Sequence, residues 1–290
     1  MNESDGSGMK INRLLWPLVL LCCMSFTSGL SCRVVDPVVD LANVSHQVTR
    51  YIALGDSIST DDYPGRDQGA VSLFYRNQDE KFPEFENRDL LSRNSELQMI
   101  VVASNGATTE TVLHNQLANL PPSSPGVMLV TLTIGGNDLL RVIHGGSRHL
   151  EEHATSIANN IQRMLGIIRT TFPNSLILVG TIYDPTDGVG DLFSPDQPLP
   201  DALKMLDLIN ARIRSFSSLP WVQLVDIHQH FLGHGLHYAD SANPHYDQGD
   251  PTYWFTSKIE PNKRGASEVR RLFWNALEEG LQTLKGVRDK

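Results

Sequence analysis

Short apolar runs alternate with amphipathic stretches along most of the chain. The clearest helical pattern covers residues 150–171, where apolar residues recur every three or four positions and a proline follows at 173. Alternation of strand and helix patterns at this spacing predicts a doubly wound, three-layer α/β/α fold around a central parallel sheet of about five strands. The strands are expected at 51–54, 99–103, 127–134, 176–182 and 222–227, and the helices near 69–78, 108–118, 150–171, 200–217 and 264–284.

Three of the apolar runs end in small or polar residues. The first is followed by Gly-Asp-Ser at 55–57, the second by Asn-Gly-Ala-Thr at 105–108 and the third by Gly-Gly-Asn-Asp at 135–138. Each set alone consists of residues that are common in turns. Because parallel strands bring their carboxyl ends to one edge of a sheet, the three sets together place a hydroxyl, a glycine N–H and an asparagine amide side by side. These are a nucleophile and two oxyanion donors, the parts that acyl transfer requires.

In this order and spacing the three motifs resemble those of the SGNH (GDSL) hydrolase superfamily of esterases and lipases. The resemblance extends from about Arg50 to the last predicted helix. It implies that Ser57 is the nucleophile and that Gly106 and Asn137 form the oxyanion hole, with a contribution from the Ser57 backbone N–H. It also implies that the reaction uses neither a metal ion nor an organic cofactor.

The general base is where the chain departs from this family. SGNH enzymes usually end with Asp-x-x-His-Pro-Asn-x-x-Gly, and the corresponding stretch here, 257–265, has Glu260 in place of the histidine and Ser257 in place of the aspartate. An ordinary glutamate has a pKa of about 4.3 against about 6.5 for histidine, so it is the poorer proton acceptor unless burial raises its pKa towards roughly 6–7. Three outcomes remain open: Glu260 is the base, a nearby histidine replaces it, or hydrolysis is slow or absent.

A histidine-rich stretch follows the fifth strand. Within it, a Phe-x-Gly-His pattern ends at His234, and some SGNH lipases and esterases have such a pattern beside their usual base. His234 is flanked by two glycines, which permit unusual backbone angles, and it is therefore the alternative base. The other interpretation of His234 is that it packs against the loop and has only a structural role. No pair of histidines and carboxylates here has the spacing of a known metal-ligand motif, so no metal site is expected.

Composition limits the class of partner. The 290 residues are 40% hydrophobic and carry a net charge of 24 − 33 = −9, with no basic cluster outside the ends of the chain. These values are typical of a globular domain with a sizeable core and argue against nucleic acid or an anionic membrane surface as a partner. The Arg270-Arg271 pair is interpreted as part of a solvated helix face.

The first residues have the pattern of a targeting segment. Residues 1–31 are predicted to be a signal peptide, because basic residues precede a short apolar run and small residues follow it, with Met9 as an alternative start. Residues 32–48 are predicted to be a tether, and 49–286 the SGNH-type domain. The protein is therefore expected to be exported to the periplasm, cell envelope or medium. Cys32 stands where a lipoprotein carries its lipid anchor, the single membrane contact considered, although Gly29 replaces the usual bulky aliphatic residue.

The sequence thus leads to an exported serine hydrolase that cleaves a lipid, acyl or acetyl-carbohydrate ester through an acyl-enzyme at Ser57. Its partner is a small-molecule, lipid or carbohydrate ester. The alternative is a catalytically weak or inactive SGNH-like module that binds a glycan or lipid at the cell envelope. The missing Asp-x-x-His pair favours this alternative, and the three intact motifs favour the enzyme.

Overall fold

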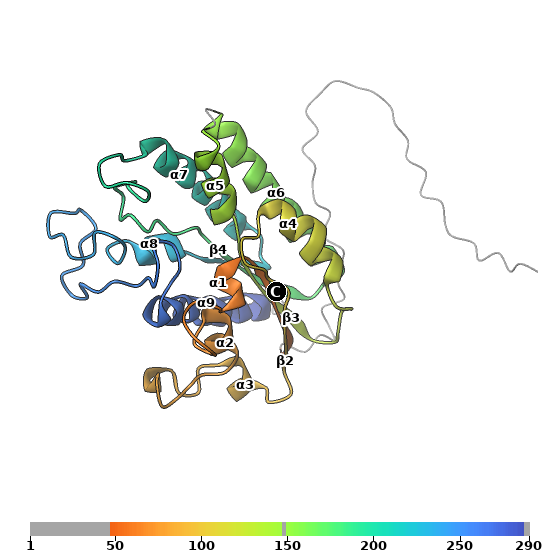
Figure 1. Cartoon of the computed structure of the whole chain (residues 1–290). Coiled ribbons are helices and arrows are strands. Elements are labelled where there is room, and N and C mark those ends of the chain that lie inside the picture. The colour runs from red at the N-terminus through yellow and green to blue at the C-terminus, as the bar shows by residue number, and fades with distance from the viewer. Residues whose placement is uncertain (1–46, 147–148, 287–290) are drawn as a thin grey trace, which may run out of the picture. The chain divides into compact units, whose positions relative to one another are not determined.

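The computed structural model describes residues 47–146 and 149–286, and its centre is a five-stranded sheet (Figure 1). The strand order is β2-β1-β3-β4-β5, and every neighbouring pair is parallel. The predicted three-layer fold is therefore confirmed, and all five strands lie where the apolar runs predicted them. The strands are β1 (Val48–Gly55), β2 (Gln98–Val101), β3 (Val127–Thr133), β4 (Ser175–Gly180) and β5 (Val222–Val225).

Helices cover both faces of the sheet, so the central strands are buried on both sides and read as continuous apolar runs. Alternate residues of each strand point to opposite faces and form two separate hydrophobic clusters. One face packs against α4 (Thr109–Thr111), η3 (Val112–Gln116), η4 (Leu117–Asn119), α5 (Gly136–His144), α6 (Leu150–Thr171), α7 (Pro200–Ser215) and η5 (Phe216–Ser218). The other packs against α2 (Ala70–Tyr75), α3 (Leu90–Arg93), α8 (Ile227–Phe231) and α9 (Lys263–Gly286), with η2 (Pro83–Phe85) beside α9.

The chain turns in opposite directions after β1 and after β3, and the two strands lie side by side in the sheet. Open α/β sheets bind their ligands at such a switch point, beyond the carboxyl ends of the strands. Here the ends of β1 and β3 are in close contact. The Asp56 N–H donates to the Thr133 carbonyl at 3.1 Å, and a Cβ on Gly55 would lie 2.1 Å from that oxygen. Gly55 also has φ +133°, so no other residue fits this position without moving β3.

Some elements differ from the prediction. The expected helix at 108–118 is divided into α4, a π-helical turn (η3) and a 3₁₀ turn (η4). Helix α5 was missed because it begins inside the Gly-Gly-Asn-Asp set, which reads as a turn. Residues 1–46 lie outside the described residues, so the signal peptide, the tether up to 46 and the anchor at Cys32 stay predictions. Within residues 47–146 and 149–286, no helix combines the length and apolar character needed to cross a membrane.

Candidate active site

Ser57 is the first residue of the short helix α1 (Ser57–Thr60), directly beyond the carboxyl end of β1. Asp56 caps this helix, and its carboxylate accepts from the Ile58 N–H at 3.2 Å. Below the turn, the Ser59 hydroxyl donates to the Leu54 carbonyl at 3.1 Å and lies 2.7 Å from the Thr133 hydroxyl. These bonds fix the backbone around Ser57 from both sides, as the position of a nucleophile requires.

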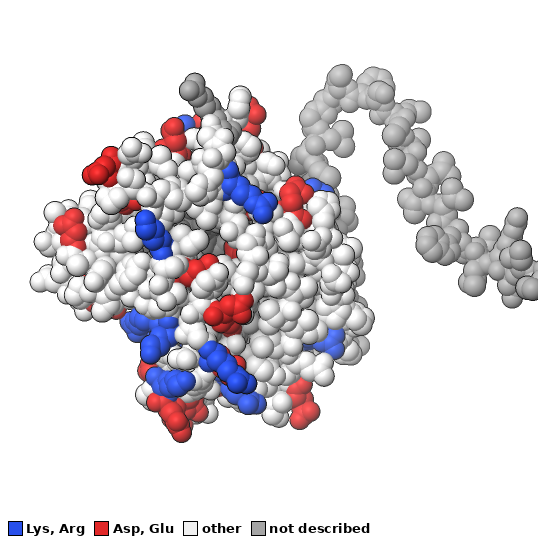
Figure 2. All heavy atoms as spheres, viewed as in Figure 1, with Lys and Arg blue, Asp and Glu red and all other residues white. Residues whose placement is uncertain are grey.

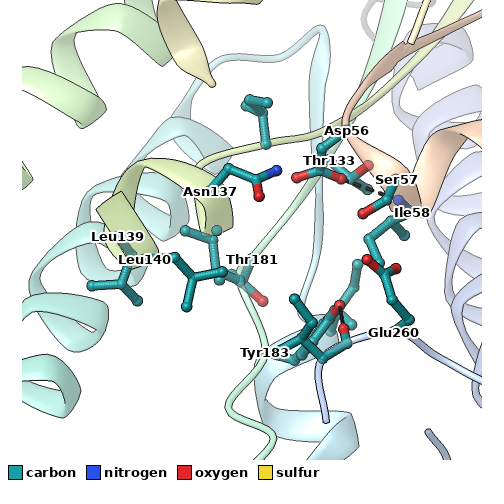
Figure 3. A pocket seen from close by; sticks show the side chains of 15 residues that line it. Asp56, Ser57, Ile58, Thr133, Asn137, Leu139, Leu140, Thr181, Tyr183 and Glu260 are labelled. Carbon is teal, nitrogen blue, oxygen red and sulfur yellow. Dashed lines mark hydrogen bonds between the residues drawn. The ribbon is translucent and has the colours of Figure 1, made fainter. Parts of the chain in front are cut away.

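A pocket of about 660 Å³, part of it open to solvent, lies at this edge of the sheet and contains Ser57. Figure 3 shows Asn137 across the pocket from Ser57, and the Glu260 carboxyl group beside the serine. Figure 2 shows acidic side chains at the hollowed centre of this face. Among the described residues that line the pocket, the charged ones are Asp56 and Glu260, both negative when ionised.

Asn137 lies in the first turn of α5 and lines the pocket. Its side-chain amide donates to the Ala107 carbonyl at 3.0 Å, which joins α5 to the loop after β2. The neighbouring Asp138 carboxylate accepts from both the N–H and the hydroxyl of Thr109, the latter at 2.6 Å. Asp138 therefore braces this loop, as acidic turn residues usually do.

Gly106 lies in the same loop, where it is exposed and has φ +70°. A Cβ there would meet no atom within 4 Å, so the backbone angle, and not crowding, explains the glycine. Gly106 is not among the residues that line the pocket. Its neighbour Asn105 accepts from the Thr60 hydroxyl of α1 at 2.6 Å, and its neighbour Ala107 accepts from Asn137. The three predicted loops thus meet at one edge, with Gly106 beside the pocket.

Glu260 precedes α9, is buried and lines the pocket. Burial raises the pKa of its carboxyl above the ordinary 4.5, and the neighbouring Ser57 hydroxyl partly opposes this effect on the pKa. Its Oε2 atom has no hydrogen-bond partner among the described residues. The Ser257 hydroxyl accepts from the Glu260 backbone N–H at 3.1 Å, so Ser257 holds the main chain of this turn.

Tyr183 provides part of the burial around Glu260, and the sequence analysis missed it. Its ring stacks on Phe231 at 5.3 Å, and its hydroxyl donates to the Ile259 carbonyl, next to Glu260. Burial, then the nearby charge of Glu260, raises the pKa of Tyr183 well above its usual value. The one signal in the sequence was its place just after the fourth apolar run.

Asp56 and Glu260 influence each other. Burial and, to a smaller extent, the charge of Glu260 raise the pKa of Asp56 to about 7, against the opposing effect of the bond from Ile58. Two carboxylates in one apolar pocket resist simultaneous ionisation, so their titrations are coupled.

His234 lies outside the lining of this pocket. Its ring stacks on Trp254 with centroids 3.5 Å apart and planes 4° apart, and its Nδ1 lies 3.1 Å from the Thr252 carbonyl oxygen. Burial lowers the pKa of His234. It does not line the pocket that contains Ser57. Of the two interpretations of this residue, structural packing fits its contacts, and its role as the alternative base stays a prediction.

The remaining lining is mostly aliphatic, and the sequence analysis did not assign it. Helix α5 supplies two leucines, and the segment after β4 supplies Ile182. No short motif marks such residues, since aliphatic side chains have the same pattern in a core. The aliphatic residues that line the pocket are Ile58, Ile134, Leu139, Leu140, Ile182, Ile227 and Ile259.

Several solved structures have the same fold. A lipase from a goat rumen metagenome superposes with a TM-score of 0.53 at 20% identity, over 79% of this chain and 97% of that one. Phospholipase A1 from Streptomyces albidoflavus gives 0.52 at 20% identity, over 79% and 99%. An extracellular lipase from Streptomyces rimosus gives 0.53 at 18% identity, over 79% and 100%. No curated protein matches the chain by sequence.

The model of the GDSL-like lipase/acylhydrolase family matches residues 53–267, which include Ser57, Asn137 and Glu260. This match covers well over half of the chain, and it agrees with the three-layer fold and with a serine at the switch point of the sheet. The chain belongs to the GDSL-like lipase/acylhydrolase family and is a carboxylic ester hydrolase by class.

Proposed function

We propose that the protein hydrolyses an uncharged ester through an acyl-enzyme at Ser57, with Glu260 as the general base. The observation that carries this proposal is the position of a buried carboxyl group beside the serine in an apolar pocket (Figure 3). A serine hydroxyl needs an adjacent base to attack a carbonyl, and a carboxylate becomes a better base as its pKa rises towards neutrality. Burial gives Glu260 this property without a histidine.

In the first half of the reaction the Ser57 oxygen attacks the acyl carbonyl while its proton passes to Glu260. The tetrahedral intermediate collapses, and protonated Glu260 returns the proton to the leaving alcohol. In the second half a water molecule gives its proton to Glu260 and attacks the acyl-enzyme. Protonated Glu260 then returns the proton to the Ser57 oxygen as the acid leaves, which restores both groups.

Donors from two loops would stabilise the negative charge on the carbonyl oxygen. The Asn137 amide has two N–H groups, one of which is bonded to Ala107, so the other is available to the substrate. The Gly106 N–H, in the loop that this bond fixes, is proposed as the second donor and the Ser57 backbone N–H as the third. Donors placed in advance around the oxyanion are usually the largest single contribution to such catalysis.

The pocket also narrows the substrate. Aliphatic walls favour an uncharged acyl group, and the two carboxyl groups, Asp56 and Glu260, disfavour an anionic one close to the reacting carbonyl. Lipid and acylated carbohydrate esters both meet these conditions. Export to the cell envelope or medium, from the pattern of residues 1–31, is part of the proposal.

Labelling with a fluorophosphonate tests the nucleophile. Wild-type protein should be labelled and should hydrolyse p-nitrophenyl butyrate, whereas Ser57→Ala should do neither. Ser218→Ala is a matched control and should keep both properties, because Ser218 is an exposed serine in η5, before the amino end of β5, and bonds to the Ser215 carbonyl. Labelling of Ser57→Ala would refute the assignment. Absence of both labelling and hydrolysis in the wild type would favour the alternative, a module that binds a glycan or lipid without cleaving it.

A further inference from the structure

Two buried side-chain amides each bind both polar groups of a single backbone residue. The Gln116 amide accepts from the Gly55 N–H at 2.9 Å and donates to the Gly55 carbonyl at 2.7 Å. The Asn210 amide accepts from the Ile182 N–H at 2.8 Å and donates to the Ile182 carbonyl at 2.8 Å. Gln116 is 3% exposed and Asn210 is fully buried.

Each amide takes the place of a strand that has ended. Strand β2 pairs with β1 up to Ala53. Beyond this point the Gln116 amide bonds to the backbone groups of Gly55 on the side where β2 lies, and the Ser104 N–H also donates to the Gly55 carbonyl. Strand β3 pairs with β4 up to Val179, and the chain then leaves β3 for α5. Further along the edge of β4 that faced β3, the Asn210 amide bonds to the backbone groups of Ile182. Backbone groups buried without a partner are costly, so both amides are needed where they lie.

The two residues held in this way belong to separate segments of the site. Gly55 is two positions before Ser57, and its turn sets the direction of the nucleophile. Ile182 lines the aliphatic wall. Both amides come from helices on the same face of the sheet, η3 for Gln116 and α7 for Asn210. The unusual π-helical turn of η3 brings Gln116 to the end of β1, and such turns are frequent at functional sites.

Gln116 also links the nucleophile to the oxyanion loop. Its Nε2 lies 3.4 Å from the Ser104 hydroxyl, two residues before Gly106. The Gln116 side chain therefore touches the two segments whose relative position sets the distance between the serine oxygen and the oxyanion donors. Asn210 makes no such link. The Ile182 carbonyl that it holds also lies 3.1 Å from the Nδ1 atom of His228.

We propose that Gln116 and Asn210 are positioning residues with separate tasks: Gln116 aligns Ser57 with the oxyanion loop, and Asn210 sets the aliphatic wall that receives the acyl group. This proposal rests on the proposed function of Ser57. Because the two amides have similar burial and the same bonding pattern, each is the matched control for the other. A purely structural role predicts the same kinetic change for both.

The test uses Gln116→Met and Asn210→Leu, which keep side-chain volume and remove both hydrogen bonds. Gln116→Met should lower kcat for p-nitrophenyl butyrate about tenfold or more with KM within about twofold, because misplacing the nucleophile costs rate. Asn210→Leu should raise KM about fivefold with kcat within about twofold, since loss of binding common to ground and transition states acts on KM. Diethyl p-nitrophenyl phosphate, a small probe, should phosphorylate Ser57 slowly in Gln116→Met and at the wild-type rate in Asn210→Leu.

Hydrogen exchange measured by mass spectrometry tests the same assignments without using activity. Exchange should accelerate at residues 53–59 in Gln116→Met and at 180–185 in Asn210→Leu, each change being confined to its own segment, because each amide protects one backbone N–H. Equal kinetic losses in the two variants, or exchange that rises throughout the sheet in both, would overturn the proposal. A wild-type protein without Ser57-dependent hydrolysis would instead refute the proposed function, and the exchange pattern would still decide whether the amides hold their two segments.

Discussion

The Glu260 carboxyl group lies beside Ser57 in the pocket (Figure 3), at the position that a histidine occupies in the usual family motif. Glutamate in place of histidine replaces a base that is neutral when active by one that is negative when active. A negative base strengthens its attraction for the serine proton as water is excluded, and burial supplies this exclusion here. The same burial makes the site intolerant of further negative charge. Both consequences can be measured.

Replacing Glu260 by glutamine should remove the proton acceptor without changing the shape of the side chain. We expect kcat for p-nitrophenyl butyrate to fall by about 10²–10⁴-fold, the range that general base catalysis contributes. His234→Ala should leave kcat within about twofold and lower the melting temperature, because His234 stacks on Trp254 away from the pocket. Steady-state kinetics and thermal unfolding of both variants check this. The assignment fails if His234→Ala abolishes turnover while Glu260→Gln keeps it.

The pH dependence of kcat/KM should report the ionisation of Glu260. Because the base must be deprotonated to act, and because burial raises its pKa above 4.5, activity should rise with pH and level off above this raised pKa. Asp56→Asn should leave the rise in place, because burial and the charge of Glu260 hold the pKa of Asp56 at about 7, so Asp56 is still neutral when Glu260 ionises. Asparagine caps a helix about as well as aspartate, so α1 should be retained. A rise that moves or disappears in Asp56→Asn would show that Asp56, and not Glu260, controls it.

Much of the fold and of the reacting set was predictable from the sequence, since both depend on local pattern. Buried parallel strands are apolar runs, and each reactive loop follows one of them. The register of the last motif was also readable. Asn262 accepts from the N–H groups of Arg264 and Gly265 at the start of α9, which explains why Pro-Asn-x-x-Gly precedes a helix and places Glu260 before it.

The environment of the reacting groups was not predictable, because it depends on segments far apart in the chain. Tyr183 shields Glu260 from a position after β4, and two leucines of the unpredicted helix α5 form part of the pocket wall. His234 shows how the two interpretations of one residue differ in their evidence. Its glycine-rich context resembled a site, but its contacts are those of a packed ring. Sequence pattern identifies reactive groups more readily than the burial that sets their pKa values.

Glu268 should give the protein stability that is lost in acid. His230, Arg264 and Arg271 surround its buried carboxylate, and their bonds and charges hold its pKa at about 2 against an ordinary 4.5. Because the folded pKa is the lower one, the stabilisation is present above pH 4.5 and disappears as pH falls towards 2. We expect Glu268→Gln to cost about 3 kcal/mol in the free energy of unfolding at pH 7 and less than half of that at pH 3.

Urea unfolding at the two pH values measures this difference. Glu278→Gln is the matched control, because Glu278 pairs with Arg93 on the surface, where its side chain is 38% exposed. An exposed pair contributes about 0–1 kcal/mol, so this variant should change little at either pH. Equal costs for the two substitutions at pH 7 would contradict the assignment of acid sensitivity to Glu268.

Arg270 corrects the interpretation of Arg270-Arg271 as a solvated face, since its side chain is completely buried. Its guanidinium lies 3.4 Å from the centroid of the Phe85 ring, donates to Asn77 at 2.8 Å and to Ser267 at 2.9 Å, and has a pKa lowered by burial to about 10. Among the described residues, no carboxylate forms an ion pair with it. The planar group is held by shape and by two neutral acceptors, which an ammonium cannot reproduce.

Arg270→Lys should therefore destabilise the protein more than Arg270→Met, although lysine keeps the charge. Lysine leaves a buried charge with fewer partners, at a cost of about 3 kcal/mol or more, whereas methionine keeps the packing on Phe85 and leaves two neutral acceptors unpaired, at about 1–2 kcal/mol. Thermal and urea unfolding of the two variants at pH 7 compare these costs. If Arg270→Lys proves the more stable of the two, charge and not planar geometry is what this position requires, and the packing of η2 against α9 depends on a cation of either kind.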